Sequence, residues 1–153
     1  MDEKSRNQVL EGVAEAARDS GVFSEVTVAG GRVACLAKGA AEPAEYRLGP
    51  DDKGKLWVSL VTSNRWLSES IETDLKHTGD KIEELLDDEL VEFGFDAGPL
   101  KVEHFRSEDL LFTFRSPIEA ANEGELRDVA LQCLLAYEAC FRQLGDMSGE
   151  TAD

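Results

Sequence analysis

The sequence predicts an α+β fold in which helices flank an antiparallel sheet. Three observations lead to this: short segments alternate apolar and polar residues, turn residues join several of them as hairpins, and amphipathic helical segments lie before, between and after them. The predicted order is α-β-β-β-α(α)-β-β-α. We expect one domain over residues 1–153 with its core at about 6–144, and frayed ends at 1–5 and 146–153.

The first elements are a helix and a hairpin. Apolar residues recur at three- and four-residue spacing over residues 6–20, and Gly21 ends the helix that this spacing predicts. Residues 22–28 then alternate like a strand, the small residues 29–31 form a turn, and 32–38 continue as a second strand.

A central strand follows the hairpin. Residues 39–43 are small and flexible in character, 46–48 predict a short strand, and 49–54 have the composition of a turn. The segment 55–62 is rich in β-branched residues and contains Trp57, so we expect it near the middle of the sheet.

Residues 64–93 have a helical spacing of apolar residues and predict two helices or one broken helix. Gly79 interrupts the spacing, and Asp80 with Glu83 forms a capping-box pattern, so a second helix is expected to start there. Residues 66–76 also alternate like a strand, which leaves both structures open for that stretch.

The last part of the chain predicts a hairpin and a long helix. Residues 100–105 and 110–114 are the two strands, and either Ser116 or Asn122 is suited to cap the helix that follows. Burying the apolar stripe of this helix contributes on the order of 10 kcal/mol before opposing terms. The stripe consists of Leu126, Val129, Ala130, Cys133, Leu134, Tyr137, Cys140, Phe141 and Leu144.

The charge composition narrows the range of partners. Acids number 32 and bases 16, which gives a net charge of −16, and 42% of the 153 residues are hydrophobic. A surface with this much negative charge repels the phosphates of nucleic acids and the headgroups of anionic lipids. Neither is therefore an expected partner. No apolar run is long enough to span a membrane and no secretion signal is visible. The charge itself serves solubility or attracts a basic partner.

Cysteines and histidines offer no metal or cofactor site. Cys35, Cys133 and Cys140 lie among apolar neighbours and form no CxxC pair, which indicates buried thiols in a reducing, cytoplasmic compartment. His77 and His104 belong to no ligand motif and are expected to be structural or surface residues.

Catalytic patterns are also missing from the sequence. His104 and Ser107 would be a base and a nucleophile without an orienting third group, and no phosphate-binding glycine loop occurs. We therefore expect a protein that is not an enzyme and that needs no cofactor. Trp57 and Trp66 are expected in core or interface packing, although an exposed tryptophan would favour a binding groove.

Two surfaces are candidates for binding a partner. Like charges at four-residue spacing repel one another, so an acidic helix face over residues 80–92 could serve a basic partner. That face consists of Glu83, Glu84, Asp87, Asp88 and Glu92. The second candidate is an apolar surface for a dimer or another protein, formed by Trp66, Leu67, Ile71 and Leu75.

The order of elements over about 6–144 resembles the type III secretion chaperone-like fold, which includes the YbjN-type proteins. The stretches 57–62 (WVSLVT) and 110–115 (LLFTFR), each placed ahead of a helix, carry most of this likeness. The resemblance implies a non-enzymatic homodimer that holds or regulates another protein through its sheet and flanking helices. The alternative is an acidic inhibitor or immunity-type protein that neutralises a basic partner.

Overall fold

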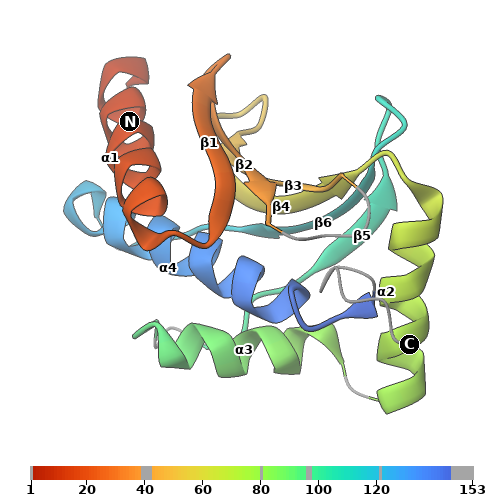
Figure 1. Ribbon diagram of the computed structural model, residues 1–153. Coiled ribbons are helices and arrows are strands. Elements are labelled where there is room, and N and C mark those ends of the chain that lie inside the picture. The colour runs from red at the N-terminus through yellow and green to blue at the C-terminus, as the bar shows by residue number, and fades with distance from the viewer. Residues whose placement is uncertain (1, 39–42, 80, 96–97, 121, 146–153) are drawn as a thin grey trace.

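A computed structural model describes residues 2–38, 43–79, 81–95, 98–120 and 122–145. It contains one six-stranded antiparallel sheet with strand order β1-β2-β3-β4-β6-β5, accompanied by four helices (Figure 1). The predicted α+β class and the antiparallel sheet are therefore confirmed. Two predictions concern residues outside the described ranges. They are the flexibility of 39–42 and the fraying of residue 1 and of 146–153. Among the described residues, every helix is too short or too polar to cross a membrane.

The N-terminal helix α1 (Glu3–Ser20) starts three residues before the predicted boundary. Asp2 caps it, because its carboxylate accepts a hydrogen bond from the amide of Ser5 at 2.7 Å. Gly21 ends it in the left-handed conformation with φ 73°, as the sequence indicates. The apolar stripe of α1 faces the sheet and consists of Leu10, Val13, Ala14 and Ala17.

Four strands follow α1 and form consecutive antiparallel pairs. Gly30 and Gly31, with φ of 62° and 76°, make the tight turn of the first hairpin. The short strand predicted at 46–48 extends over six residues and pairs along its length with the next strand, which lies in the middle of the sheet as expected. The strands are β1 (Phe23–Ala29), β2 (Arg32–Ala37), β3 (Glu45–Pro50) and β4 (Leu56–Thr62).

The helical region forms two helices, α2 (Arg65–Thr78) and α3 (Ile82–Glu92), so the stretch that could also have been a strand is helical. Asn64 caps α2 by accepting a hydrogen bond from the amide of Leu67 at 2.9 Å. The N-cap position of α3 is Lys81, whose side chain makes no capping hydrogen bond, and Asp80 of the predicted capping box lies outside the described residues. The Glu83 carboxylate instead accepts a hydrogen bond from the amide of Val102 at 3.3 Å.

The C-terminal part forms the expected hairpin, β5 (Glu103–Arg106) and β6 (Phe112–Pro117), and the long helix α4 (Glu123–Phe141). Of the two possible starts of the helix, the structure has Asn122, whose side chain accepts a hydrogen bond from the amide of Glu125 at 3.0 Å. Ser116 belongs to β6 and lies in the core.

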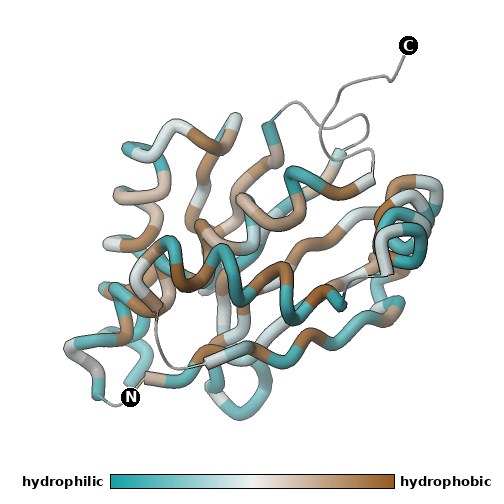
Figure 2. Tube along the Cα trace, turned by 90° about the horizontal axis from the view of Figure 1, so that it is seen from below, coloured by the Kyte–Doolittle hydropathy of each residue, from teal (hydrophilic) through white to brown (hydrophobic). Residues whose placement is uncertain are grey.

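The helices cover one face of the sheet. In Figure 1, α4 runs beneath the sheet, α1 stands beside β1, α3 lies below α4 and α2 stands beside β5. The view from below in Figure 2 shows hydrophobic and hydrophilic segments alternating along the helices, as expected for elements with one buried face. The opposite face of the sheet carries no helix over the described part of the chain, although some of its side chains, such as those of Val61 and Thr113, are buried.

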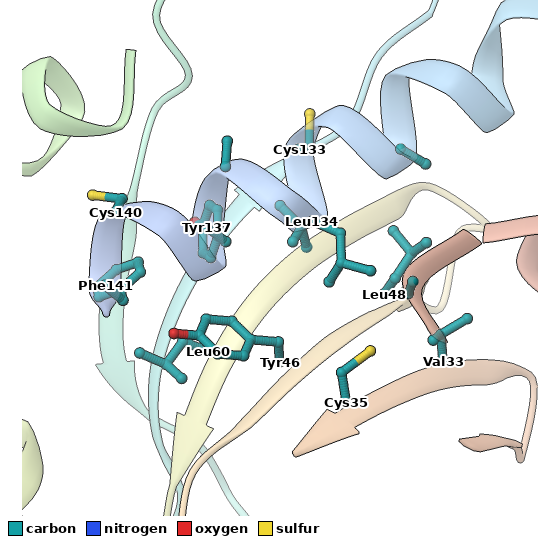
Figure 3. Close-up of a cluster of buried hydrophobic side chains, with 14 of the residues drawn as sticks. Val33, Cys35, Tyr46, Leu48, Leu60, Cys133, Leu134, Tyr137, Cys140 and Phe141 are labelled. Atoms are coloured by element: carbon teal, nitrogen blue, oxygen red, sulfur yellow. The ribbon is translucent and has the colours of Figure 1, made fainter. Parts of the chain in front are cut away.

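The core lies between α4 and the sheet. Figure 3 shows Leu134, Tyr137 and Phe141 of α4 directed toward Tyr46 and Leu60 of the strands. All five side chains are at most 1% exposed. The rings of Tyr137 and Phe141 pack in a tilted arrangement with centroids 5.3 Å apart, which adds a specific contact to the general burial.

One fully buried hydrogen bond joins the sheet to α4: the hydroxyls of Ser116 and Tyr137 are 2.6 Å apart. Ser116→Ala leaves the Tyr137 hydroxyl buried without this partner, so we expect a loss of about 1–3 kcal/mol in the free energy of unfolding, measured by urea denaturation. Ser116→Ala combined with Tyr137→Phe removes both polar groups and should cost less than Ser116→Ala alone. If the double variant is less stable than Ser116→Ala alone, this account is wrong.

The three cysteines are buried and free, as predicted. Burial raises the pKa of each thiol, Cys35, Cys133 and Cys140, to about 12. At pH 8 only roughly one thiol in ten thousand would then be the reactive thiolate. We expect the native protein to resist a thiol reagent such as DTNB, and all three cysteines to react when guanidinium unfolds the chain. A fast-reacting thiol in the native state would show that one of them is accessible.

Candidate functional site

The candidate site is the open face of the sheet, meaning the face opposite α1 and α4. Side chains alternate across a sheet, so residues next to the core-facing ones point to the open face. Strand register places one row of five residues there in neighbouring strands: Ala34, Arg47, Ser59, Arg115 and Glu103. The middle of this row is Ser59, which is flanked by an arginine on each side.

Arg115 lies between two aromatic rings. Its guanidinium carbon is 4.0 Å from the ring centroid of Trp57 and 4.9 Å from that of Phe105. Its Nε donates a hydrogen bond to the Glu103 carboxylate at 2.9 Å. Only a planar guanidinium makes both stacking contacts and the hydrogen bond at once, so this arrangement holds the open face in a defined shape.

Trp57 is held in place from the loop between β3 and β4. Its indole Nε1 donates to the Asp51 carboxylate at 2.9 Å, and the same carboxylate accepts hydrogen bonds from the amides of Lys55 and Lys53. The hydrogen bond from Trp57 is the main cause that lowers the pKa of Asp51. Asp51 is therefore a firm acceptor at neutral pH, and the indole ring is fixed over the sheet.

Arg47 occupies the centre of the open face. Its side chain is 20% exposed, and its Nε is buried with no hydrogen-bond partner among the described residues. Within the described ranges its ionic contact is with Glu45, at 3.4 Å. A buried N–H without a partner is unfavourable, and because this Nε has almost no exposed surface, a ligand would meet the other N–H groups of the Arg47 guanidinium.

Arg32 adds a third cation beside Gly49. A Cβ on Gly49 would lie 2.7 Å from the Cβ of Arg32, which is closer than such atoms approach in proteins. Glycine at this position therefore lets Arg32 stand close to the centre of the open face. Because β2 and β3 are adjacent strands, Arg32 and Arg47 belong to the same part of the surface.

A hollow of about 540 Å³ lies over these residues and extends toward the N-terminus of α1. Four arginines and three acids line it, although the whole chain has twice as many acids as bases. The arginines are Arg6, Arg32, Arg47 and Arg115. The open face is thus the place where cations gather on an otherwise acidic protein.

The turn between β5 and β6 forms one rim of the hollow. Leu110 in this turn has φ 63°, a left-handed conformation that costs a non-glycine residue about 1 kcal/mol, and its side chain is 60% exposed. Glycine would adopt this backbone without strain. Its neighbours Asp109 and Leu111 line the hollow, and an exposed leucine between them is available for contact with a partner.

The predicted apolar surface on α2 is largely internal. Leu67 and Ile71 are fully buried and Leu75 is partly buried against the core, whereas Trp66 is 71% exposed. Of these four residues, Trp66 alone is well exposed. The other three are four residues apart and therefore share one face of α2, and this face packs against the core. Together with Thr73 and His77, Trp66 lines a shallow hollow on the outer side of α2.

The predicted acidic face lies on the solvent side of α3, while Leu86 and Leu90 of the same helix are buried. Glu84, Asp88 and Glu92 are exposed, and Glu83 and Asp87 are half-buried. Within the described ranges, none of these five acids forms an ion pair. Val91, 61% exposed, interrupts the acids with an apolar side chain.

The two histidines are in separate places. His104 on β5 stacks on Phe114 at 3.8 Å, and its ring nitrogens contact the carbonyl of Thr113 and the carboxylate of Glu72, which ties α2 to the sheet. The Ser107 hydroxyl accepts a hydrogen bond from the amide of Leu111 and does not form the pair with His104 that was considered from the sequence. No group of three or more potential metal ligands is gathered among the described residues.

The sequence-based interpretation missed the open face. It assigned Trp57 to core or interface packing and did not single out Arg47, Arg115 or Phe105. The signal was present in the alternation of 56–62, where leucine and valine at even positions face the core and Trp57 is at an odd position. What strand alternation does not reveal is which of two faces a helix will cover.

Comparison with models of known families, with curated proteins and with solved structures gives no match. The open face is therefore interpreted from its own geometry.

We expect the stacking of Arg115 on Trp57 to be worth about 0.5–1 kcal/mol. Arg115→Lys keeps the charge and loses the planar stack, so it should lower the free energy of unfolding by about that amount. A double-mutant cycle that combines Arg115→Lys with Trp57→Leu, measured by urea denaturation, isolates the pairwise energy. A coupling energy near zero would show that the two side chains are merely adjacent.

Proposed function

We propose that this protein is a non-enzymatic protein-binding module, chaperone-like or regulatory, that recognises another protein through the open face of its sheet. The observation that carries the proposal is the Arg115–Trp57–Phe105 stack beside Arg47, on a sheet face that no described helix covers. Tryptophan and arginine are the residues that most often dominate the energy of protein interfaces. The resemblance in element order to type III secretion chaperone-like proteins agrees with this function, and a cytoplasmic location is part of the proposal.

The composition of the open face also favours a protein partner. An interface needs an anchored centre of aromatic or arginine side chains with a polar rim. Trp57 and Arg115 are anchored by Asp51 and Glu103, and Leu110 offers an apolar contact at the rim. These groups are arranged before a partner arrives, which lowers the entropic cost of binding.

A homodimer is part of the same proposal. Trp66 on the outer side of α2 is the largest exposed apolar side chain, and it lies away from the open face on a different element. A contact between copies through Trp66 would leave the open face free for another protein.

A second candidate is an acidic inhibitor or immunity-type protein that binds a basic partner through α3. The observation that favours it is the helix composition: α3 has six acids and no base, and its exposed acids flank the exposed side chain of Val91. Like charges so close together destabilise a helix slightly, and a cationic partner would relieve that repulsion.

Photo-crosslinking in cells of the native host discriminates between these two surfaces. Phe105 on the open face and Phe93 at the end of α3 are a matched pair, because both are phenylalanines and they are 37% and 38% exposed. Each is replaced in turn by benzoylphenylalanine. We expect protein adducts, detected as a mass shift of the tagged chain, from position 105 and few from position 93.

The opposite pattern would support the acidic inhibitor instead. If neither position gives an adduct above the level of an unsubstituted chain, the proposal of protein recognition through the open face is wrong. An adduct at position 105 with twice the mass of the chain would show that the open face meets a second copy.

A further inference from the structure

The distribution of cations indicates what kind of partner the open face accepts. Its hollow is lined by four of the chain's arginines, whereas elsewhere acids predominate. Three of these four lie on strands: Arg32 on β2, Arg47 on β3 and Arg115 on β6. Each is held by the sheet, so their positions relative to one another are set by strand register.

The neighbouring acids leave much of the donor capacity of these arginines unused. A guanidinium has five N–H donors. Glu45 takes a single long contact from Arg47 at 3.4 Å, and Glu103 takes one hydrogen bond from Arg115. No ion pair of Arg32 occurs among the described residues. A ligand with carboxylates would satisfy donors that the protein itself leaves open.

Spacing favours more than one carboxylate on the ligand. Arg47 and Arg115 are separated by β4, which places their strands about 10 Å apart. In an extended segment, side chains two residues apart lie on the same side at a distance of about 7 Å. Because arginine side chains are long, two acids at this spacing would reach Arg47 and Arg115 on either side of Ser59.

We infer that the open face binds an acidic, extended segment of a partner protein, with carboxylates on Arg47 and Arg115 and further contact to Arg32. This inference rests on the proposed function, since it names the chemistry of the partner that this face recognises. A short acidic segment would gain charge-assisted hydrogen bonds from the arginines of the open face. The acidic surface around that face would contact other parts of the partner protein.

The same residues are less suited to a single-stranded nucleic acid. Such ligands bind by stacking their bases on aromatic faces that are free. The guanidinium of Arg115 lies on the rings of both Trp57 and Phe105 and blocks stacking there.

The test measures binding of labelled ten-residue peptides by fluorescence polarisation. The probes are a peptide that alternates glutamate and threonine, its glutamine counterpart, its lysine counterpart, and a ten-nucleotide oligothymidine. We expect the glutamate peptide to bind at least about tenfold more tightly than the glutamine peptide, because a hydrogen bond to a charged group is worth about 1.5–3 kcal/mol.

Variants locate the binding on the open face. Arg47→Gln should weaken binding of the glutamate peptide by about fivefold or more, and Arg115→Gln should act in the same direction. Arg127→Gln is the matched control, because Arg127 belongs to α4 on the helix side and its side chain is 64% exposed. Circular dichroism and thermal unfolding confirm that each variant is folded.

Equal binding of the glutamate and glutamine peptides, no binding of the glutamate peptide at 1 mM, or an equal loss in Arg127→Gln would overturn the inference. Tighter binding of oligothymidine than of the glutamate peptide would overturn it in favour of a nucleic acid. The photo-crosslinking experiment separates failure of this inference from failure of the proposed function. If adducts from position 105 persist in Arg47→Gln, protein recognition stands and the acidic segment is rejected. If the chain without Arg47→Gln gives no adducts, protein recognition through the open face is rejected.

Discussion

The packing of α4 against one face of the sheet is the contact on which the rest of this structure depends. Leu134, Tyr137 and Phe141 pack beside Tyr46 and Leu60, and all five side chains are essentially inaccessible. Burying side chains of this size is worth about 1.5–3 kcal/mol each before opposing terms. The other helices are arranged around this contact, with α1 beside α4 on the sheet and α3 on its outer side.

A sheet covered on one side must solve a second problem on the other side. An exposed sheet face of valine and leucine would promote aggregation between chains. A polar face avoids this but needs side-chain contacts that hold its residues in place. The open face meets both needs with Arg115, which stacks on Trp57 and Phe105 and is bound to Glu103. Apolar ring surface is thereby covered by a guanidinium, and the charge remains at the surface.

The two sides of the molecule differ in their charged residues, although acids occur on both. The exposed acids of α3 lie beneath the core on the outer helix layer, and the strand arginines lie on the open face. A chain of this composition could have paired its bases with its acids throughout, and some pairs do occur, such as Arg65 with Glu69. Concentrating arginines in one hollow creates two surfaces with different electrostatic preferences, one for acidic and one for basic groups.

The sequence by itself determined the element types, because periodicity and capping residues act locally: Gly21 and Asn122 bound their helices, and alternation identifies the strands. Local signals were weaker where two patterns competed, as over residues 66–76, which alternate like a strand but form part of helix α2. Only the tertiary structure decided which side of each element is covered. Leu67 and Ile71 became core, whereas Trp57 and Arg47 came together on an open face, because a repeat of two or 3.6 residues shows which side chains share a face and not what packs against it.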